Sequence, residues 1–202
     1  MGQVRLCVLV SGSGTILEAM IERGLDIALV ASDRPCRALD VAAKANIEVL
    51  LVDRAAFGGF SPEFDRTEYS RTLARELSSR AIDLVAMAGF GTITTKEFHE
   101  AFPGRVLNTH PSLLPLFKGW HAVRQAVEAG ASETGCTVHI ATEELDAGPI
   151  LAQVRVEVLG TDDEATLHER IKEVERELYP RVVRDAIEAL REGNEPSTLT
   201  RS

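Results

Sequence analysis

Residues 105–115 read RVLNTHPSLLP: a strand-like apolar run ends in two polar side chains, Asn108 and His110, and prolines follow. Side chains two positions apart in a strand point to the same face, so Asn108 and His110 can face one ligand. The residue before a proline is kept out of helical geometry, which places the end of the strand at His110. The stretch predicts a buried strand with a polar end. Taken alone, an Asn-x-His pair also fits a loop that only satisfies its own polar groups.

The segments around this strand predict the sheet to which it belongs. Short apolar runs at residues 4–10, 26–32, 47–52, 83–88 and 105–109 alternate with helical patterns at 14–24, 36–45, 64–80 and 95–102. That alternation is typical of a parallel sheet covered by helices on both faces. After residue 130 come two strand candidates, 134–142 and 149–158, with no helix between them. We therefore predict a Rossmann-like α/β fold, with a mostly parallel sheet and an antiparallel C-terminal edge.

A long helix is predicted to follow the last strand. Thr161 and Glu164 have the spacing of a capping box. Apolar residues then recur at three- and four-residue steps, at Leu167, Ile171, Val174, Leu178 and Val182. Glu175 lies at the margin of that face, where a solvated carboxylate is the simplest interpretation. Residues 193–202 are expected to form a flexible tail, and 1–202 a single domain, because no linker or repeat divides the chain.

The composition argues against several classes of protein and site. A formal net charge of −9 disfavours nonspecific binding to nucleic acid or anionic membranes, which needs a basic surface. No segment approaches the roughly 20 apolar residues of a membrane span, and the N-terminus lacks a signal-peptide pattern. Three cysteines without a CxxC motif favour reduced thiols in the cytoplasm. Five histidines without HxxxH or HExxH spacing predict that no metal is bound.

Two further segments carry candidate ligand groups, because ligands of open parallel sheets bind beyond the carboxyl ends of the strands. SGSGT, residues 11–15, joins the first strand to a helix, and its backbone N–H groups suit a phosphate. An ordinary tight turn fits that loop equally well. Leu17 at the third glycine position weakens a dinucleotide fingerprint, although Asp33 lies near the place of a ribose-binding carboxylate. Asp146, in ELDAGPIL (144–151), is most simply a residue that stabilises its own turn.

Three nearby residues have a structural interpretation. Trp120 and His121 are better explained as the start of a helix than as the lining of a pocket. His139 alternates with strand residues and is better explained as a packed side chain than as a catalytic one.

The chain resembles the folate-dependent formyltransferases, on NTHPSLLPLFKGWHA (108–122) and the downstream ETGCTVHIATEELDAGPIL (133–151). Three other segments occur in the same order and spacing as in the family: SGSGT (11–15), DLVAMAGF (83–90) and HERIKEVERELYP (168–180). The resemblance therefore covers about residues 4–190. Within the family it is closest to the enzymes that formylate glycinamide ribonucleotide (GAR) in purine biosynthesis. It implies the formyltransferase fold and transfer of the formyl group of the co-substrate 10-formyltetrahydrofolate to the GAR amine, giving formylglycinamide ribonucleotide and tetrahydrofolate.

The resemblance also implies catalytic roles. The tetrahedral intermediate carries negative charge on oxygen, and a donor such as the Asn108 amide can contribute on the order of 10²–10³ in rate. His110 would move protons between the two nitrogens, since histidine titrates near neutral pH. Asp146 would favour charged His110 and order a water between the substrates.

The resemblance further implies two binding regions. The GAR phosphate would lie on the backbone of Gly14, Thr15 and Ile16, and Glu175 would face the amine end of GAR. The residues expected at the folate are Arg66, Gly91, Thr92, Ile93, Thr94, Asn108, Thr142, Glu143, Glu144, Leu145 and Asp146.

The sequence departs from the family at two places. Ile16 stands where many members have Asn, so a side-chain contact to the phosphate is lost and the backbone alone remains. Gly91-Thr92 stands where Met-Arg is common, which predicts weaker side-chain packing against folate at this loop.

Other functions stay open at this point. Methionyl-tRNA or a sugar amine would be alternative acceptors, but the tRNA enzymes carry an extra basic C-terminal domain. Formyltetrahydrofolate hydrolases use water as acceptor and usually have His-His-Ser where this chain has His-Pro-Ser at 110–112. A non-catalytic nucleotide-binding domain would use residues 11–15 and Asp33. The sequence also leaves a homodimer open.

Overall fold

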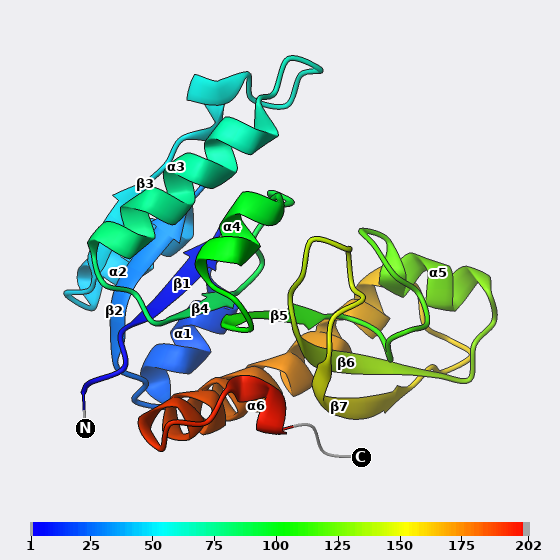
Figure 1. The fold of residues 1–202 in the computed structure, drawn as a ribbon. Helices are drawn as coiled ribbons and strands as arrows, with labels where there is room; N and C mark the ends of the chain where they lie inside the picture. The colour runs from blue at the N-terminus through cyan, green and yellow to red at the C-terminus, as the bar shows by residue number, and fades with distance from the viewer. Residues whose placement is uncertain (1, 200–202) are drawn as a thin grey trace.

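The computed structural model describes residues 2–199 and confirms the predicted class of fold. Within this part of the chain, seven strands form one sheet in the order β3-β2-β1-β4-β5-β6-β7 (Figure 1). Strands β1 to β5 pair in parallel, whereas β5, β6 and β7 pair in antiparallel. Their bounds are β1 Leu6–Val10, β2 Ile27–Ser32, β3 Glu48–Leu51, β4 Leu84–Met87, β5 Val106–His110, β6 Glu133–Ile140 and β7 Ile150–Glu157.

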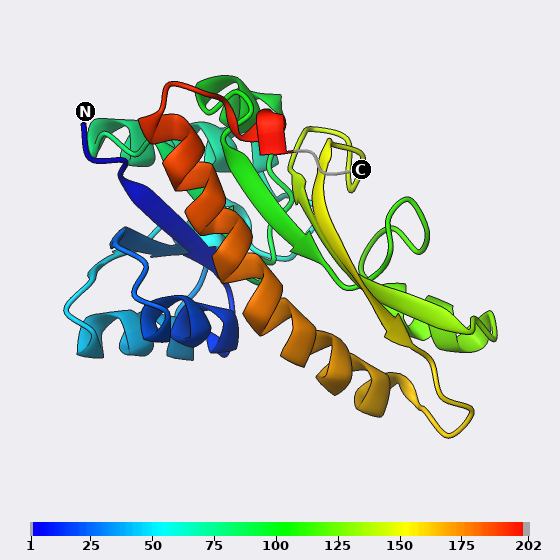
Figure 2. The same ribbon diagram turned by 90° about the horizontal axis from the view of Figure 1, so that it is seen from below.

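Helices cover both faces of the sheet because the central strands are apolar on both faces. In β1, Leu6, Val8 and Val10 belong to one core, while Cys7 and Leu9 belong to the other. The first core is covered by α1 (Thr15–Glu22), α2 (Arg37–Lys44) and α6 (Glu164–Arg191), with α5 (Ala122–Glu128) beside β6 (Figures 1 and 2). The second is covered by α3 (Arg66–Ser79) and α4 (Lys96–Ala101), with the short 3₁₀ helix η1 (Arg54–Phe57) leading into α3.

The start of α6 corrects one prediction. The capping box is formed by Asp163, whose side chain accepts from the backbone N–H of Thr166 while the Thr166 hydroxyl accepts in return. The pair predicted from spacing, Thr161 and Glu164, is wrong because Asp163 is the last extended residue before the helix, and Glu164 is already helical.

The C-terminal segment is packed where the structure describes it. Glu195 pairs with Arg105 at 2.8 Å, Pro196 is buried, and the 3₁₀ helix η2 (Pro196–Leu199) contacts α6 and β7. Residues 195–199 of the expected flexible tail thus contact the rest of the fold, and residues 200–202 lie outside the described residues.

The topology places the functional segments at one edge of the sheet. The direction of strand addition reverses between β1 and β4, and a crevice at the carboxyl ends of the strands is expected there. The loops that follow β1 and β4 meet at this crevice beside the end of β5. Among the described residues, no helix combines the length and the apolar character that a membrane span requires.

Candidate active site

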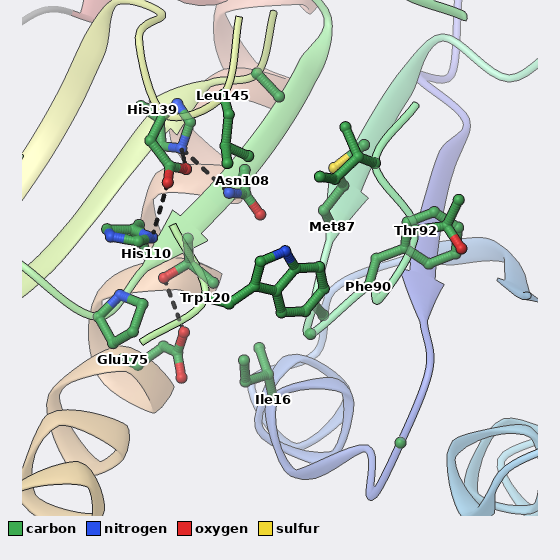
Figure 3. Close-up of a pocket in the computed structure, with 18 of the residues that line it drawn as sticks. Ile16, Met87, Phe90, Thr92, Asn108, His110, Trp120, His139, Leu145 and Glu175 are labelled. Atoms are coloured by element: carbon green, nitrogen blue, oxygen red, sulfur yellow. Dashed lines mark hydrogen bonds and ion pairs between the residues drawn. The ribbon is translucent and has the colours of Figure 1, made fainter. Parts of the chain in front are cut away.

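A cleft of about 430 Å³ opens at the carboxyl edge of the sheet (Figure 3). Its walls come from the loop after β1, the loop after β4, the end of β5, the turn between β6 and β7, and one face of α6. Its volume lies within the range of roughly 300–1,000 Å³ that is usual for small-molecule sites.

Asn108 and His139 face each other as register partners of β5 and β6, with Asn108 Nδ2 and His139 Nε2 3.1 Å apart. His139 Nδ1 lies 3.1 Å from the carbonyl oxygen of Ile140, which only accepts, so Nδ1 carries the proton. Burial lowers the pKa of His139 against the opposing effects of Ile140 and Asp146, so the ring is neutral at neutral pH. Nε2 therefore accepts from Asn108, and the second N–H of the Asn108 amide is left for a ligand.

His110 lies between two acceptors. Its Nε2 is 2.8 Å from the carbonyl oxygen of Phe117, and its Nδ1 is 3.4 Å from Asp146 Oδ2. Both groups accept, so a proton on either ring nitrogen of His110 faces an acceptor. Asp146 Oδ2 also accepts from Gly119 N at 2.9 Å, while Oδ1 lies 3.6 Å from His139 Nε2. The buried carboxylate thus faces His110, while its Oδ1 lies beyond hydrogen-bond distance of the unprotonated Nε2 of His139.

The turn that holds Asp146 depends on close packing against β6. Asp146 has a φ of +52°, in the left-handed region, which Asp adopts more readily than most residues. Two residues on, a Cβ at Gly148 would lie 1.8 Å from the carbonyl oxygen of Ile140, so only glycine fits. The Asp-x-Gly turn therefore has a structural role, and it brings the Asp146 carboxylate to the cleft beside His110.

The loop after β1 presents the N-terminus of α1 to the cleft. Gly14 precedes the helix with a φ of +79°, and a Cβ there would lie 2.9 Å from Ala38 of α2. Gly14, Thr15 and Ile16 all line the cleft, where the helix dipole favours an anion. Helix α6 adds Lys172 to the same lining, which brings a cation to the cleft.

Glu175 of α6 is buried at the cleft rather than solvated at a helix flank. It is 9% exposed, and its Oε1 accepts from the hydroxyl of Thr109 at 2.9 Å. Burial raises the pKa of Glu175 more than the hydrogen bond from Thr109 lowers it. The solvated-flank interpretation is wrong because the helix turns this position toward the strand that carries Asn108 and His110 (Figure 3).

Two arginines fill the space beside Gly91 and Thr92. A Cβ at Gly91 would lie 2.7 Å from Arg34 Nη2, and Arg54 Nη1 donates to the Thr92 hydroxyl at 3.2 Å. Arg34 also donates twice to Asp33, at 2.9 and 2.8 Å, and the Thr92 hydroxyl donates to Asp33 at 2.7 Å. The loop is therefore packed against the protein itself, and the weaker side-chain packing against folate that the sequence predicts stays a prediction.

The same contacts argue against a ribose-binding role for Asp33. Its side chain is fully buried and both oxygens are hydrogen-bonded, one to Arg34 and one to Arg34 and Thr92. Burial works to raise the pKa of Asp33, but the hydrogen bonds from Arg34 and Thr92 together hold it low.

Most of the predicted site residues line the cleft together. They are Gly14, Thr15, Ile16, Thr92, Ile93, Thr94, Asn108, His110, Thr142, Glu143, Leu145, Asp146 and Glu175. Three do not line it. Gly91 lies beside Ser11 and Arg34, Glu144 is exposed in the turn, and Arg66 is exposed at the first residue of α3.

Two residues that line the cleft have only a structural interpretation in the sequence analysis. Trp120 lines it and precedes α5, which begins at Ala122. His139 is packed, as predicted, but it also holds Asn108. The strand pattern gives the face of His139, whereas its partner depends on the register between β5 and β6. Within residues 2–199, no three His, Cys, Asp or Glu side chains gather in a metal-binding arrangement.

Comparison with known proteins identifies relatives of this chain. The formyl transferase family matches residues 4–183. The phosphoribosylglycinamide formyltransferase of Mycobacterium tuberculosis is 43% identical over 179 residues, 86% of this chain and 80% of that protein. The enzyme of the same name from Escherichia coli is 35% identical over 187 residues, 89% of this chain and 85% of that protein. The crystal structure of glycinamide ribonucleotide transformylase 1 from Symbiobacterium toebii superposes with a TM-score of 0.82 at 39% identity, covering 96% of this chain and 90% of that one.

Proposed function

The chain belongs to the formyl transferase family, and we propose that it transfers the formyl group of 10-formyltetrahydrofolate to the amine of GAR. The observation that carries this proposal is the Asn108 amide, held by neutral His139 with one N–H left for the cleft, beside the His110–Asp146 pair. A donor at that place suits an oxyanion, and a charged imidazole with a carboxylate suits the accompanying proton transfers.

The steps of the reaction follow from these groups. The GAR amine forms a bond to the formyl carbon, and the carbonyl electron pair moves to oxygen, where the free N–H of Asn108 stabilises the charge. The attacking amine loses a proton, through the ordered water, toward the Asp146 carboxylate. The folate N10 gains a proton from the His110–Asp146 pair as its bond to carbon breaks, and tetrahydrofolate leaves.

The acceptor half of the cleft has the groups that GAR needs. Its phosphate lies on the backbone at Gly14, Thr15 and Ile16, since Ile16 offers no polar side chain, and Lys172 adds a compensating charge. Glu175 faces the amine end, fixed by its hydrogen bond from Thr109.

The folate half lies on the other side of Asn108. The pterin contacts the loop at Thr92, Ile93 and Thr94 and the turn from Thr142 to Asp146, both of which line the cleft. Toward the outside, Arg54 and Arg66 supply positive charge for the carboxylates of the folate tail. Burial lowers the pKa of Arg54, and repulsion from Arg34 and then Arg66 lowers it further, against the attraction of Asp33.

The direct test is release of tetrahydrofolate by purified protein supplied with formyl-folate and GAR. We expect release only when both substrates are present, and formylated GAR in equal amount. Release at the same rate without GAR would indicate a hydrolase, and absence of release would contradict the proposal. We also infer a cytoplasmic location, which the free thiols of Cys7, Cys36 and Cys136 support.

A further inference from the structure

Trp120, the only tryptophan of the chain, projects into the cleft. Figure 3 shows its indole between Asn108 and Ile16, at the border of the reaction centre and the loop proposed for phosphate. The side chain is 66% exposed, which is unusual for so large an apolar group. An indole left in water within a substrate cleft gains contact area when a ligand arrives.

The backbone around Trp120 is fixed, in contrast to its side chain. Gly119 N donates to Asp146 Oδ2 at 2.9 Å, and the carbonyl of Phe117 accepts from His110 Nε2 at 2.8 Å. Helix α5 begins two residues later, at Ala122. The segment that carries the indole is thus hydrogen-bonded to both members of the His110–Asp146 pair, so the exposed side chain extends from an anchored backbone.

The groups that serve an amine would serve water equally well. Water attack would form a bond from the water oxygen to the formyl carbon, break the bond to folate N10, place a proton on N10 and release formate. Asn108, His110 and Asp146 offer nothing that distinguishes the two nucleophiles. Selection of the amine therefore requires that water be kept from the formyl carbon.

We propose that Trp120 is a specificity-determining residue that closes over the formyl carbon once formyl-folate is bound and excludes water from it. This inference rests on the proposed function. Ile16 forms the apolar surface that the indole meets on the acceptor side, which gives its unusual position in the phosphate loop a purpose (Figure 3).

The test is the ratio of formate to formylated GAR produced from formyl-folate and GAR by the full chain. For Trp120→Ala we expect that ratio to rise about tenfold, because the cleft then admits water. Trp120→Phe retains an aromatic cover and should stay near the parent ratio. Leu116→Ala is the matched control: Leu116 is 57% exposed in the same loop but does not line the cleft, and its removal should leave the ratio unchanged.

A second readout uses the parent protein alone. The emission of the single tryptophan should shift to shorter wavelength when GAR and a non-reactive folate analogue are added together, because the indole leaves water. This measurement decides the matter if Trp120→Ala fails to fold, as judged by circular dichroism. An unshifted emission, or a folded Trp120→Ala variant with the parent ratio, would overturn the inference while leaving the proposed function intact. A parent that makes no formylated GAR would overturn both.

Discussion

The Nδ2 of Asn108 lies 3.1 Å from the Nε2 of His139, and the carbonyl of Ile140 determines which nitrogen of that imidazole carries the proton. The direction of the Asn108 amide is therefore fixed before any substrate arrives. A donor that needs no reorganisation is worth more in a water-excluded cleft than the same donor in solution. This pair of residues is the basis of the catalytic account.

Asn108→Ala should lower kcat for formyl transfer by a factor on the order of 10²–10³, with little change in KM, because the donor acts on charge that develops only in the transition state. Steady-state kinetics with GAR and formyl-folate measure this. Gln3→Ala is the control: it removes an exposed side-chain amide near the N-terminus that does not line the cleft, and it should leave kcat unchanged. Parent-like kcat in a folded Asn108→Ala protein would remove Asn108 from the mechanism.

His139→Leu should lower kcat by about tenfold, because the Asn108 amide then rotates freely although its donor is still present. In the double variant with Asn108→Ala the second substitution should cost nothing further, since the two residues act as a unit. Thr134→Val is the control: Thr134 is buried on the same strand, its hydroxyl has no partner among the described residues, and it does not line the cleft. Additive losses in the double variant would show that His139 acts by another route.

Glu175→Gln should raise stability at neutral pH and weaken the use of GAR. Burial raises the folded-state pKa of Glu175 above its unfolded value of about 4.3, so the folded protein binds more protons between these two values. Stability due to this group is therefore lost as pH rises through that interval. The variant should melt like the parent near pH 4 and about 2–4 °C higher at neutral pH.

The kinetic part of that prediction concerns the acceptor side. KM for GAR should rise in Glu175→Gln while KM for formyl-folate stays close to the parent value, because the carboxylate faces the GAR half of the cleft. Glu177→Gln, an exposed carboxylate on the same helix, serves as control. Equal KM values for GAR in Glu175→Gln and parent would contradict the assignment.

Arg54→Ala should raise KM for formyl-folate several-fold. The rise should be larger for a folate with several glutamates in its tail than for a folate with one glutamate, because each carboxylate adds an interaction with the Arg34–Arg54–Arg66 region. KM for GAR should not change. Arg71→Ala removes an exposed arginine of α3 that pairs with Glu97, and it controls for loss of one positive charge. If the rise in KM were the same for short and long glutamate tails, this role of Arg54 would be ruled out.

The sequence predicts the order of strands and helices well, because the hydrophobic periods are local. Strand β1 carries apolar residues on both faces and reads as a continuous run, and α6 shows one apolar stripe. The exact start of α6 cannot be read from local sequence in this way, because Thr161, Asp162 and Asp163 are all suitable caps. In the structure Asp162 accepts from Leu159 N and pairs with Arg170, and Asp163 caps the helix.

The residues of the site also divide into those that the local sequence predicts and those that depend on how distant segments pack. Asn108, His110 and Asp146 could be predicted to lie together because the family motif names them, and Asn108 and His110 share a face of one strand. The partner of Asn108 could not, because it depends on the register that places His139 opposite it. Arg34 and Arg54 were missed for a similar reason: they reach Gly91 and Thr92 only through the packing of β2 and η1 against the loop after β4.

Affinity for a tetrahedral analogue tests the central claim most directly. The probe joins GAR to a folate through a hydroxyl-bearing tetrahedral carbon, and its dissociation constant is measured calorimetrically for the parent and for Asn108→Ala. We predict a loss of affinity on the order of 10²–10³, matching the loss in kcat, because both report stabilisation of the same oxygen. Equal affinities in the two proteins would contradict the account.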